Sequence, residues 1–361
     1  MAATYPLRIS MKSRQDVLVH LGSGMGNILM ATPMIEMLGR GGYSVDLCLQ
    51  GETPDVETIF HNWPYVRSVS SNPDVFKQVR YGYYIYGAEV KGQPIDFPGR
   101  HQAVILHPVW DWRVGFDLHS EIELYTNIAR AIDPDLPVVR QPNCSHSGRT
   151  FDDISPKTCV LIPGGQKQMV IRKWPYYGSL ARHFNDVAVV GLPSDLDMTN
   201  RIVFPRLARK LFGEALNYQG KVWRIARQFS ERYDQPLDLP KHVKNYMGRL
   251  TLADTAALIS QAGYVIGNDS GLTHLAVALG KPTFVVIGPT SRRKVFPSFL
   301  KNVHVISLSY DCQPCQENPK LNVWRESMSQ CFCPHRIRCM NDLQSRHVME
   351  VVNAQLQIGC A

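Results

Sequence analysis

Short apolar runs alternate with segments of helical spacing along most of the chain. Near its start, an apolar run over 16–22 ends in glycine, a glycine-rich turn follows, residues 28–38 have helical spacing, and 43–49 form a second apolar run. Runs this short and continuous are typical of parallel strands buried on both faces. The order of strand, glycine turn, helix and strand predicts a βαβ unit of an α/β domain.

The same pattern restarts in the second half of the chain. Between the halves, residues 133–156 carry four prolines and no hydrophobic period, as expected of a linker. We therefore predict an α/β fold with two doubly wound domains facing one another, 1–150 and 151–341. For a closing helix over 342–357, packing back on the first domain is one option. The other predicted strands are 103–106, 158–162, 187–190, 264–267 and 283–287, and the other helices are 120–132, 175–184, 252–262 and 272–279.

The start of the sequence is not expected to act as a targeting signal. The first fifteen residues are polar and lack the apolar core of a signal peptide. No stretch approaches the roughly 20 apolar residues of a bilayer span. The sequence predicts a cytoplasmic protein, with peripheral contact at the inner membrane as a further option.

Composition and charge narrow the class of partner. The 361 residues are 44% hydrophobic, which excludes a disordered chain, and 39 Lys and Arg face 31 Asp and Glu, a net +8. Such a balance favours an anionic partner. Residues 1–160 hold 14 basic and 17 acidic residues (−3), and the remainder hold 25 and 14 (+11). The basic excess therefore lies in the second predicted domain.

The strongest local motif runs from Ile266 to Ala276. A predicted strand delivers Asp269, Ser270 and Gly271 to the start of a helix. Free backbone amides and the positive end of the helix dipole make such a place an anion site, and Ser270 can both cap the helix and donate to a phosphate. His274 lies one turn into the helix. An ordinary capped turn with a core histidine is the alternative.

Two weaker motifs contain glycine. Gly164 and Gly165 follow a predicted strand, and the nearby pair Arg172 and Lys173 could neutralise a diphosphate. The alternative is a solvated basic loop. The spacing of the first glycine turn, Gly22-x-Gly24-x-Gly26, differs from the GxGxxG of dinucleotide sites, and Asp46 lies within the next strand instead of closing it. A nicotinamide oxidoreductase is therefore disfavoured.

These three segments, in this order, resemble glycosyltransferase family 9, the heptosyltransferases of lipopolysaccharide core assembly. Arg172-Lys-Trp-Pro175 is similar to the basic-Trp-Pro motif of that family, and Asp269-Ser-Gly-Leu-Thr-His274 is similar to its donor-site signature. The likeness extends to residues 28–33, 119–125, 278–282 and 288–290.

The resemblance implies a GT-B fold, in which two Rossmann-like domains face a central cleft, and inverting transfer from a nucleotide-diphospho-sugar. Ser270, Gly271 and Thr273 would hold the diphosphate. Asp269 would contact the donor sugar or order the loop, and Asp195 would lie near the nucleoside. The donor-binding set is Gly164, Gly165, Arg172, Lys173, Asp195, Asp269, Ser270, Gly271, Thr273 and His274, and the acceptor-binding set is Ser23, Gly24, Met25 and Gly26.

One position departs from the family. The family's presumed catalytic base is an aspartate directly after the opening glycine, and this chain has Asn27 at that position. A neutral amide cannot accept a proton as a carboxylate does. Another base acts, or Asn27 orients the acceptor, or activity is lost. Our candidate substitutes are His107 and Asp111, with Asp117 as a third, since they follow the strand 103–106 at the end that should face the cleft.

Five of the nine cysteines lie between residues 312 and 339. Thiolates at C-x₂-C spacing bind zinc, so a structural zinc site is one prediction, and reduced cysteines or one disulfide are the alternatives. We expect no catalytic metal and no cofactor for the transfer itself. The cluster consists of Cys312, Cys315, Cys331, Cys333 and Cys339.

The sequence thus predicts an enzyme that moves a sugar from an ADP-heptose-like donor to a hydroxyl of the lipopolysaccharide core or another glycan or glycolipid. A glycosyltransferase acting on modified DNA or protein is one alternative. A nucleotide-sugar-binding homologue without activity is the other, and Asn27 permits it. A nucleic-acid partner is less favoured because the positive excess lies in the donor half.

Overall fold

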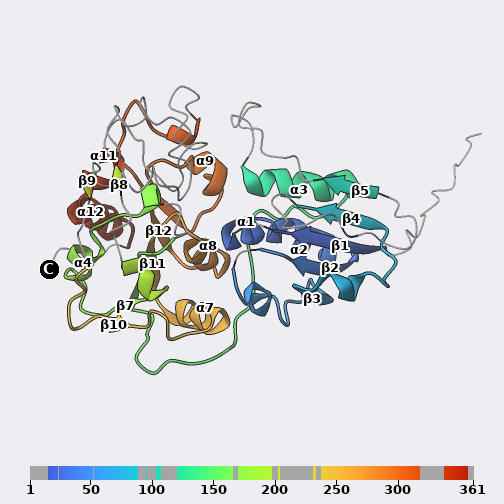
Figure 1. Ribbon diagram of the computed structural model, residues 1–361, viewed down its shortest axis with the longest axis horizontal. Coiled ribbons are helices and arrows are strands. Elements are labelled where there is room, and N and C mark those ends of the chain that lie inside the picture. Colours follow the sequence, from blue (N-terminus) through green and yellow to red (C-terminus); the bar gives the residue numbers. More distant parts are fainter. Residues whose placement is uncertain are drawn as a thin grey trace, which may run out of the picture.

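The computed structural model shows two α/β lobes joined by an extended linker (Figure 1). The residues it describes are 15–22, 24–51, 53–87, 95, 103–106, 120–165, 170–196, 202–203, 231–232, 237–317 and 337–356.

The first lobe is built on a parallel sheet with the strand order β3-β2-β1-β4-β5. Its central strands β1 and β2 are mostly apolar and are buried at every position but the first, as expected of strands covered on both faces. The strands are β1 (Asp16–Leu21), β2 (Ser44–Leu49), β3 (Ser68–Ser70), β4 (Tyr83–Tyr86) and β5 (Ala103–Leu106), and the helices are α1 (Met25–Met30), α2 (Thr32–Arg40), η1 (Val56–Ile59), η2 (Pro73–Phe76) and α3 (Glu121–Ile132).

Helix α3 begins with a capping box. The Ser120 hydroxyl accepts a hydrogen bond from the Glu123 amide at 3.2 Å, and the Glu123 carboxylate accepts one from the Ser120 amide at 2.8 Å. Two amides that the helix leaves without a partner are satisfied in this way. Ser120 is thus the N-cap of α3, at the start of the predicted helix 120–132.

The second lobe is built on a parallel sheet with the strand order β10-β7-β6-β11-β12-β13, and β8 (Ile202–Val203) pairs with β9 (Glu231–Arg232) separately. The sheet strands are β6 (Cys159–Ile162), β7 (Val187–Val189), β10 (Lys244–Asn245), β11 (Tyr264–Asn268), β12 (Thr283–Val286) and β13 (Val303–Ile306). The helices are η3 (Val170–Arg172), α4 (Tyr177–Ala181), η4 (Pro193–Leu196), α7 (Leu252–Gln261), α8 (Gly271–Ala278), α9 (Arg292–Val295), η6 (Cys315–Glu317), α11 (Arg338–Asn341) and α12 (Ser345–Leu356).

The two lobes meet where α1 packs against α8 (Figure 1). Met30 and Ile122 of the first lobe share an apolar cluster with Val277 and Phe296 of the second. The Gln141 side chain also donates a hydrogen bond to the Val277 carbonyl at 2.9 Å. The starts of two helices, one from each lobe, are therefore held in contact.

Helix α12 packs on the second lobe, against α4 and β13. Val348 and Val352, four residues apart on one face, are fully buried in the core of that lobe. The suggested packing of this helix on the first domain is wrong, because an amphipathic face requires a partner but does not specify which one. None of the helices in the described ranges is long and apolar enough to cross a bilayer.

Candidate active site

Each sheet has a point at which its strand order changes direction. In the second sheet this point lies between β6 and β11, because β7 and β10 lie on one side of β6 and β11 and β12 lie on the other. In the first sheet the corresponding point lies between β1 and β4. Ligands of open parallel sheets bind beyond the carboxyl ends of the strands at such points. Gly164 and Gly165 follow β6 there, Asp269 and Ser270 follow β11, and residues 24–26 follow β1.

Asp269 forms the centre of the arrangement after β11. Its carboxylate is 3% exposed and lies 3.1 Å from Arg172 Nη1 and 3.5 Å from His274 Nε2. Burial alone would raise the pKa of this carboxyl. The Arg172 guanidinium and the hydrogen bond with His274 outweigh burial and hold the pKa well below its usual range. Asp269 is therefore a buried anion that pairs with the Arg172 guanidinium on one side and faces the His274 ring on the other.

His274 lies at the contact between the lobes. Its ring stacks on Phe296, with centroids 4.5 Å apart and an interplanar angle of 11°. It also faces Gly26 of α1, where an added Cβ would stand 2.8 Å from His274 Cδ2. A residue with a side chain at position 26 would displace the ring. The structure thus brings together Gly26, predicted on the acceptor side, and His274, predicted on the donor side.

The start of α8 is formed by Ser270 and Gly271. Ser270 is the N-cap in extended conformation, but its side chain makes no capping hydrogen bond, so that part of the prediction is wrong. Its hydroxyl instead pairs with the Thr273 hydroxyl at 3.1 Å. Gly165 lies nearby, since its added Cβ would stand 3.8 Å from Ser270 Cβ. The glycine turn after β6 and the helix start after β11 therefore adjoin.

Asp195 lies beneath the turn at Gly164 and Gly165. Its carboxylate accepts a hydrogen bond from the Leu192 amide at 2.8 Å, and the Gly165 amide and Lys173 also interact with it. Burial raises the pKa of this carboxyl, against the effect of those three groups. In this structure Asp195 supports the glycine turn, and the predicted contact with a nucleoside stays a prediction.

Replacing Gly164 by alanine is expected to lower the free energy of unfolding by about 1–2 kcal/mol, as overpacking does in a close-packed interior. The new Cβ would fall on the Asp195 carboxylate. Gly165→Ala is the matched control, because its added Cβ would make only an ordinary contact, 3.8 Å from Ser270 Cβ. Thermal unfolding of both variants measures the difference, and equal midpoints would contradict the steric role of Gly164.

The pair Arg172 and Lys173 does not form a solvated loop. Arg172 is paired with Asp269, and Lys173 is buried near Asp195. Trp174 follows them, fully buried, and its Nε1 donates to the Leu343 carbonyl at 2.6 Å. The alternative of a solvated basic loop is therefore wrong for these two residues.

Sequence reasoning missed Asn268 and Phe296. The Asn268 side chain is buried and accepts from the Trp174 amide and the Tyr177 hydroxyl at 3.2 and 3.0 Å, while it donates to the Pro163 carbonyl at 2.7 Å. The available signal was an amide at the end of an apolar strand, directly before Asp269. Phe296 carries no local signal, because its partner His274 belongs to a separate helix.

Several predicted residues cannot be compared with the structure. Ser23, His107, Asp111, Asp117, Cys331 and Cys333 lie outside the described residues. Gly24 is the N-cap of α1, and Asn27 lies in the first turn of that helix.

Within the described ranges no three metal-ligating side chains form a group. The base and the zinc site stay predictions.

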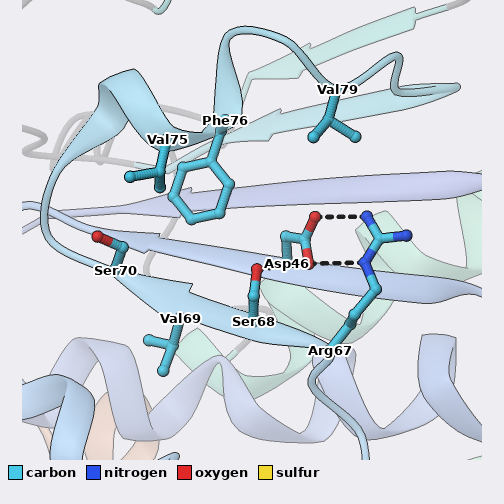
Figure 2. Close-up of a pocket in the computed structure, with 8 residues that line it drawn as sticks. All are labelled: Asp46, Arg67, Ser68, Val69, Ser70, Val75, Phe76 and Val79. Carbon is cyan, nitrogen blue, oxygen red and sulfur yellow. Dashed lines mark hydrogen bonds and ion pairs between the residues drawn. The ribbon is translucent and has the colours of Figure 1, made fainter.

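A groove of about 600 Å³ lies on the first lobe, on the face of the sheet opposite α1 and α2 (Figure 2). At its floor Asp46 accepts two hydrogen bonds from Arg67, at 3.0 and 2.5 Å. The Tyr81 and Ser68 hydroxyls also donate to Asp46, at 2.7 and 2.8 Å. Because the protein itself uses this carboxylate, Asp46 is not available to a dinucleotide ribose, a further argument against a nicotinamide site.

Comparison with known proteins gives a family match that includes the start of α8. Residues 231–323, which include Asp269 to His274, match the family described as glycosyltransferase family 9 (heptosyltransferase). The resemblance to glycosyltransferase family 9 is confirmed. Within a stretch of 56 residues, 16% of each chain, the protein is 38% identical to lipooligosaccharide heptosyltransferase 2 of Haemophilus influenzae.

Solved structures extend the likeness to the whole fold. ADP-heptose lipopolysaccharide heptosyltransferase II of E. coli has a TM-score of 0.59 at 16% identity, covering 95% of this chain and 98% of that one. The iron-containing dodecameric glycosyltransferase TibC of enterotoxigenic E. coli H10407 has a TM-score of 0.58 at 14% identity, covering 96% and 77%. The family 9-like chain therefore has the GT-B fold.

Proposed function

We propose that this family 9-like protein is an inverting glycosyltransferase that takes a sugar from a nucleotide-diphospho-sugar. The observation that carries the proposal is the Asp269 carboxylate, held between Arg172 and His274 at the start of α8. This arrangement stands at the direction change of the second sheet, beside Gly165. The family 9 match over 231–323 and a structure of TibC in complex with ADP-D-β-D-heptose support an ADP-heptose-like donor.

In the proposed donor complex the diphosphate lies at the start of α8. The backbone amides of the first helical turn and the positive end of the helix dipole favour an anion. Ser270, Gly271 and Thr273 supply the contacts, and Arg172 supplies positive charge. The +11 of residues 161–361, from 25 basic and 14 acidic residues, supports an anionic ligand in this half.

In the proposed reaction a base removes the proton of the acceptor hydroxyl as its oxygen attacks the anomeric carbon. The bond between that carbon and the diphosphate oxygen breaks, and the nucleoside diphosphate leaves with the electron pair. Amides and Arg172 stabilise the charge that develops on the leaving group. His107 or Asp111 is the proposed base, and alanine variants that keep full turnover would exclude each.

The acceptor is proposed to be a hydroxyl of the lipopolysaccharide core or another glycolipid, met at the inner membrane from the cytoplasmic side. The likeness to two heptosyltransferases named for lipooligosaccharide and lipopolysaccharide supports it. It would be held by Gly24, Met25 and Gly26, opposite His274. One observation favours a second candidate, a nucleotide-sugar-binding protein without transferase activity: Asn27 stands where the family's presumed base belongs.

The first test is a thermal-shift panel of ADP, UDP, GDP and their sugar conjugates. A ligand at 100 times its Kd stabilises the native state by about 2.7 kcal/mol, so the matching nucleotide is expected to raise the unfolding midpoint by a few degrees. ADP and ADP-sugars should give the largest rise. If no nucleotide moves the midpoint, the donor site is wrong. Binding without donor hydrolysis or transfer would favour the inactive homologue.

We also propose a structural metal in the cysteine-rich segment. Cys339 Sγ lies 2.9 Å from the point where a Cβ of Gly288 would stand, and next to Cys315 the Gln316 amide donates to the Pro289 carbonyl at 3.1 Å. The Cys339 thiol and the backbone beside Cys315 thus both lie next to the residues that follow β12. Since TibC is described as iron-containing, the metal content of the purified protein should be measured for zinc and for iron. Much less than one metal per chain would exclude the site.

A further inference from the structure

The Asn268 amide connects three separate segments of the proposed donor site. Its oxygen accepts from the Trp174 amide at 3.2 Å and from the Tyr177 hydroxyl at 3.0 Å. Its nitrogen donates to the Pro163 carbonyl at 2.7 Å. The side chain is 1% exposed, so these protein groups replace water as its hydrogen-bonding partners. Both ends of the amide are therefore used, and each end has a different chemical role.

The neighbouring residue forms a second, parallel connection. Asn268 contacts Trp174, and Asp269 pairs with Arg172. Two consecutive residues at the end of β11 thus hold two residues of the segment 172–174. A shift of this segment along β11 would break both contacts together, so the two contacts fix the register in which Arg172 is presented.

The third segment is the turn after β6. The Pro163 carbonyl that Asn268 binds comes directly before Gly164 and Gly165, and Asp195 supports the same turn from beneath through the Gly165 amide. Asn268 therefore fixes the entry to the turn, while Asp195 fixes its far side. Gly165 then lies against Ser270 at the start of α8.

We propose that Asn268 is a positioning residue for donor binding, which sets the glycine turn and Arg172 at the distance that a nucleoside diphosphate requires. The inference rests on the proposed function and adds to it a buried residue that acts through the segment 172–174 and the glycine turn. Hydrogen-bond chemistry makes the amide specific. A carboxylate of the same size could still accept from Trp174 and Tyr177, but it could not donate to Pro163 and would place its charge against that carbonyl.

The test uses Asn268→Asp in the full chain, with ADP, UDP and GDP titrated by calorimetry and unfolding midpoints measured alongside. We expect the affinity for the nucleotide that wild type binds best to fall about tenfold or more, as when a buried polar partner is left unsatisfied. Asn302→Asp is the matched control. The Asn302 amide also donates to two backbone carbonyls of the same lobe, those of Val277 and Lys281, at 3.1 Å each.

The control is expected to lower the unfolding midpoint and to leave the nucleotide affinity within about twofold. If Asn268→Asp also lowers only the midpoint, Asn268 has a purely structural role and the inference is wrong. If Asn268→Asp does not fold, Tyr177→Phe replaces it, because it removes one hydrogen bond to the Asn268 side chain and keeps the ring. A two- to threefold loss of affinity is expected there, and unchanged affinity overturns the inference. A wild-type chain that binds none of the three nucleotides would instead refute the proposed function.

Discussion

Replacing Asp269 by asparagine is expected to lower the free energy of unfolding by about 3–5 kcal/mol, as when one partner of a buried ion pair is removed. The substitution leaves the Arg172 guanidinium, only 18% exposed, without its counter-charge, and it removes the carboxylate that faces His274. Chemical denaturation at neutral pH measures the loss. The thermal shift given by the best nucleotide should disappear with it, because Arg172 is no longer held in place.

Asp238→Asn is the control for this variant. Asp238 pairs with Arg182 at 3.4 Å in the same lobe, but the two side chains are 86% and 61% exposed. Exposed pairs contribute about 0–1 kcal/mol, so this variant should unfold almost as wild type does and keep the nucleotide shift. Equal losses of stability in the two variants would show that burial of the Asp269 pair has no energetic consequence.

The second large effect is expected at Asp46, for which Asp46→Asn should cost about 2–3 kcal/mol of unfolding free energy at pH 7. The range is reduced from that of a fully buried pair because Arg67 is 43% exposed. Burial alone would raise the pKa of Asp46, but the hydrogen bonds from Arg67, Tyr81 and Ser68 lower it. The carboxylate therefore stabilises the fold above the pKa of an unfolded aspartate, about 3.9, and this contribution is lost as pH falls through the folded value.

Urea denaturation between pH 3 and pH 7 tests this second prediction. Wild type should lose stability on acidification over that range, and Asp46→Asn should lose less of it, because the group that binds a proton on unfolding has been removed. Asp74→Asn serves for comparison, since Asp74 is 67% exposed and pairs with Lys77, the residue that follows η2. Parallel pH profiles for wild type and Asp46→Asn would refute the linkage.

Secondary structure around the site could be predicted from local pattern. The predicted strand 264–267 and helix 272–279 differ from β11 and α8 by one residue at their ends. Burial on both faces produced a continuous apolar run, and the polar residues after it marked the turn. The predicted helix 175–184 was less accurate, because the observed α4 covers only Tyr177–Ala181.

The connections within the site could not be predicted in the same way. Arg172 and Asp269 lie almost a hundred residues apart, and no periodicity states which charges will meet. Asn268 illustrates the limit best. Its partners Trp174 and Pro163 offer backbone groups, which are present at nearly every position, so the sequence carries no mark of the pairing. The family resemblance named the residues of the turn but not the amide that holds them.

The contact between α1 and α8 links the two halves of the molecule chemically. Gly26 faces His274, and Gly271 faces Met25, whose Cε would lie 2.9 Å from an added Cβ. Each helix start therefore presents a glycine to a side chain of the other. Any ligand that moves the start of α8 must also move the first turn of α1. By linkage, the factor by which a bound donor-side ligand changes the affinity for an acceptor-side ligand equals the factor by which the acceptor-side ligand changes the affinity for the donor-side ligand. Through the contacts of Gly26 and Gly271, ligand binding to one lobe is expected to change the ligand affinity of the other. No segment between the lobes has to fold or unfold for this effect.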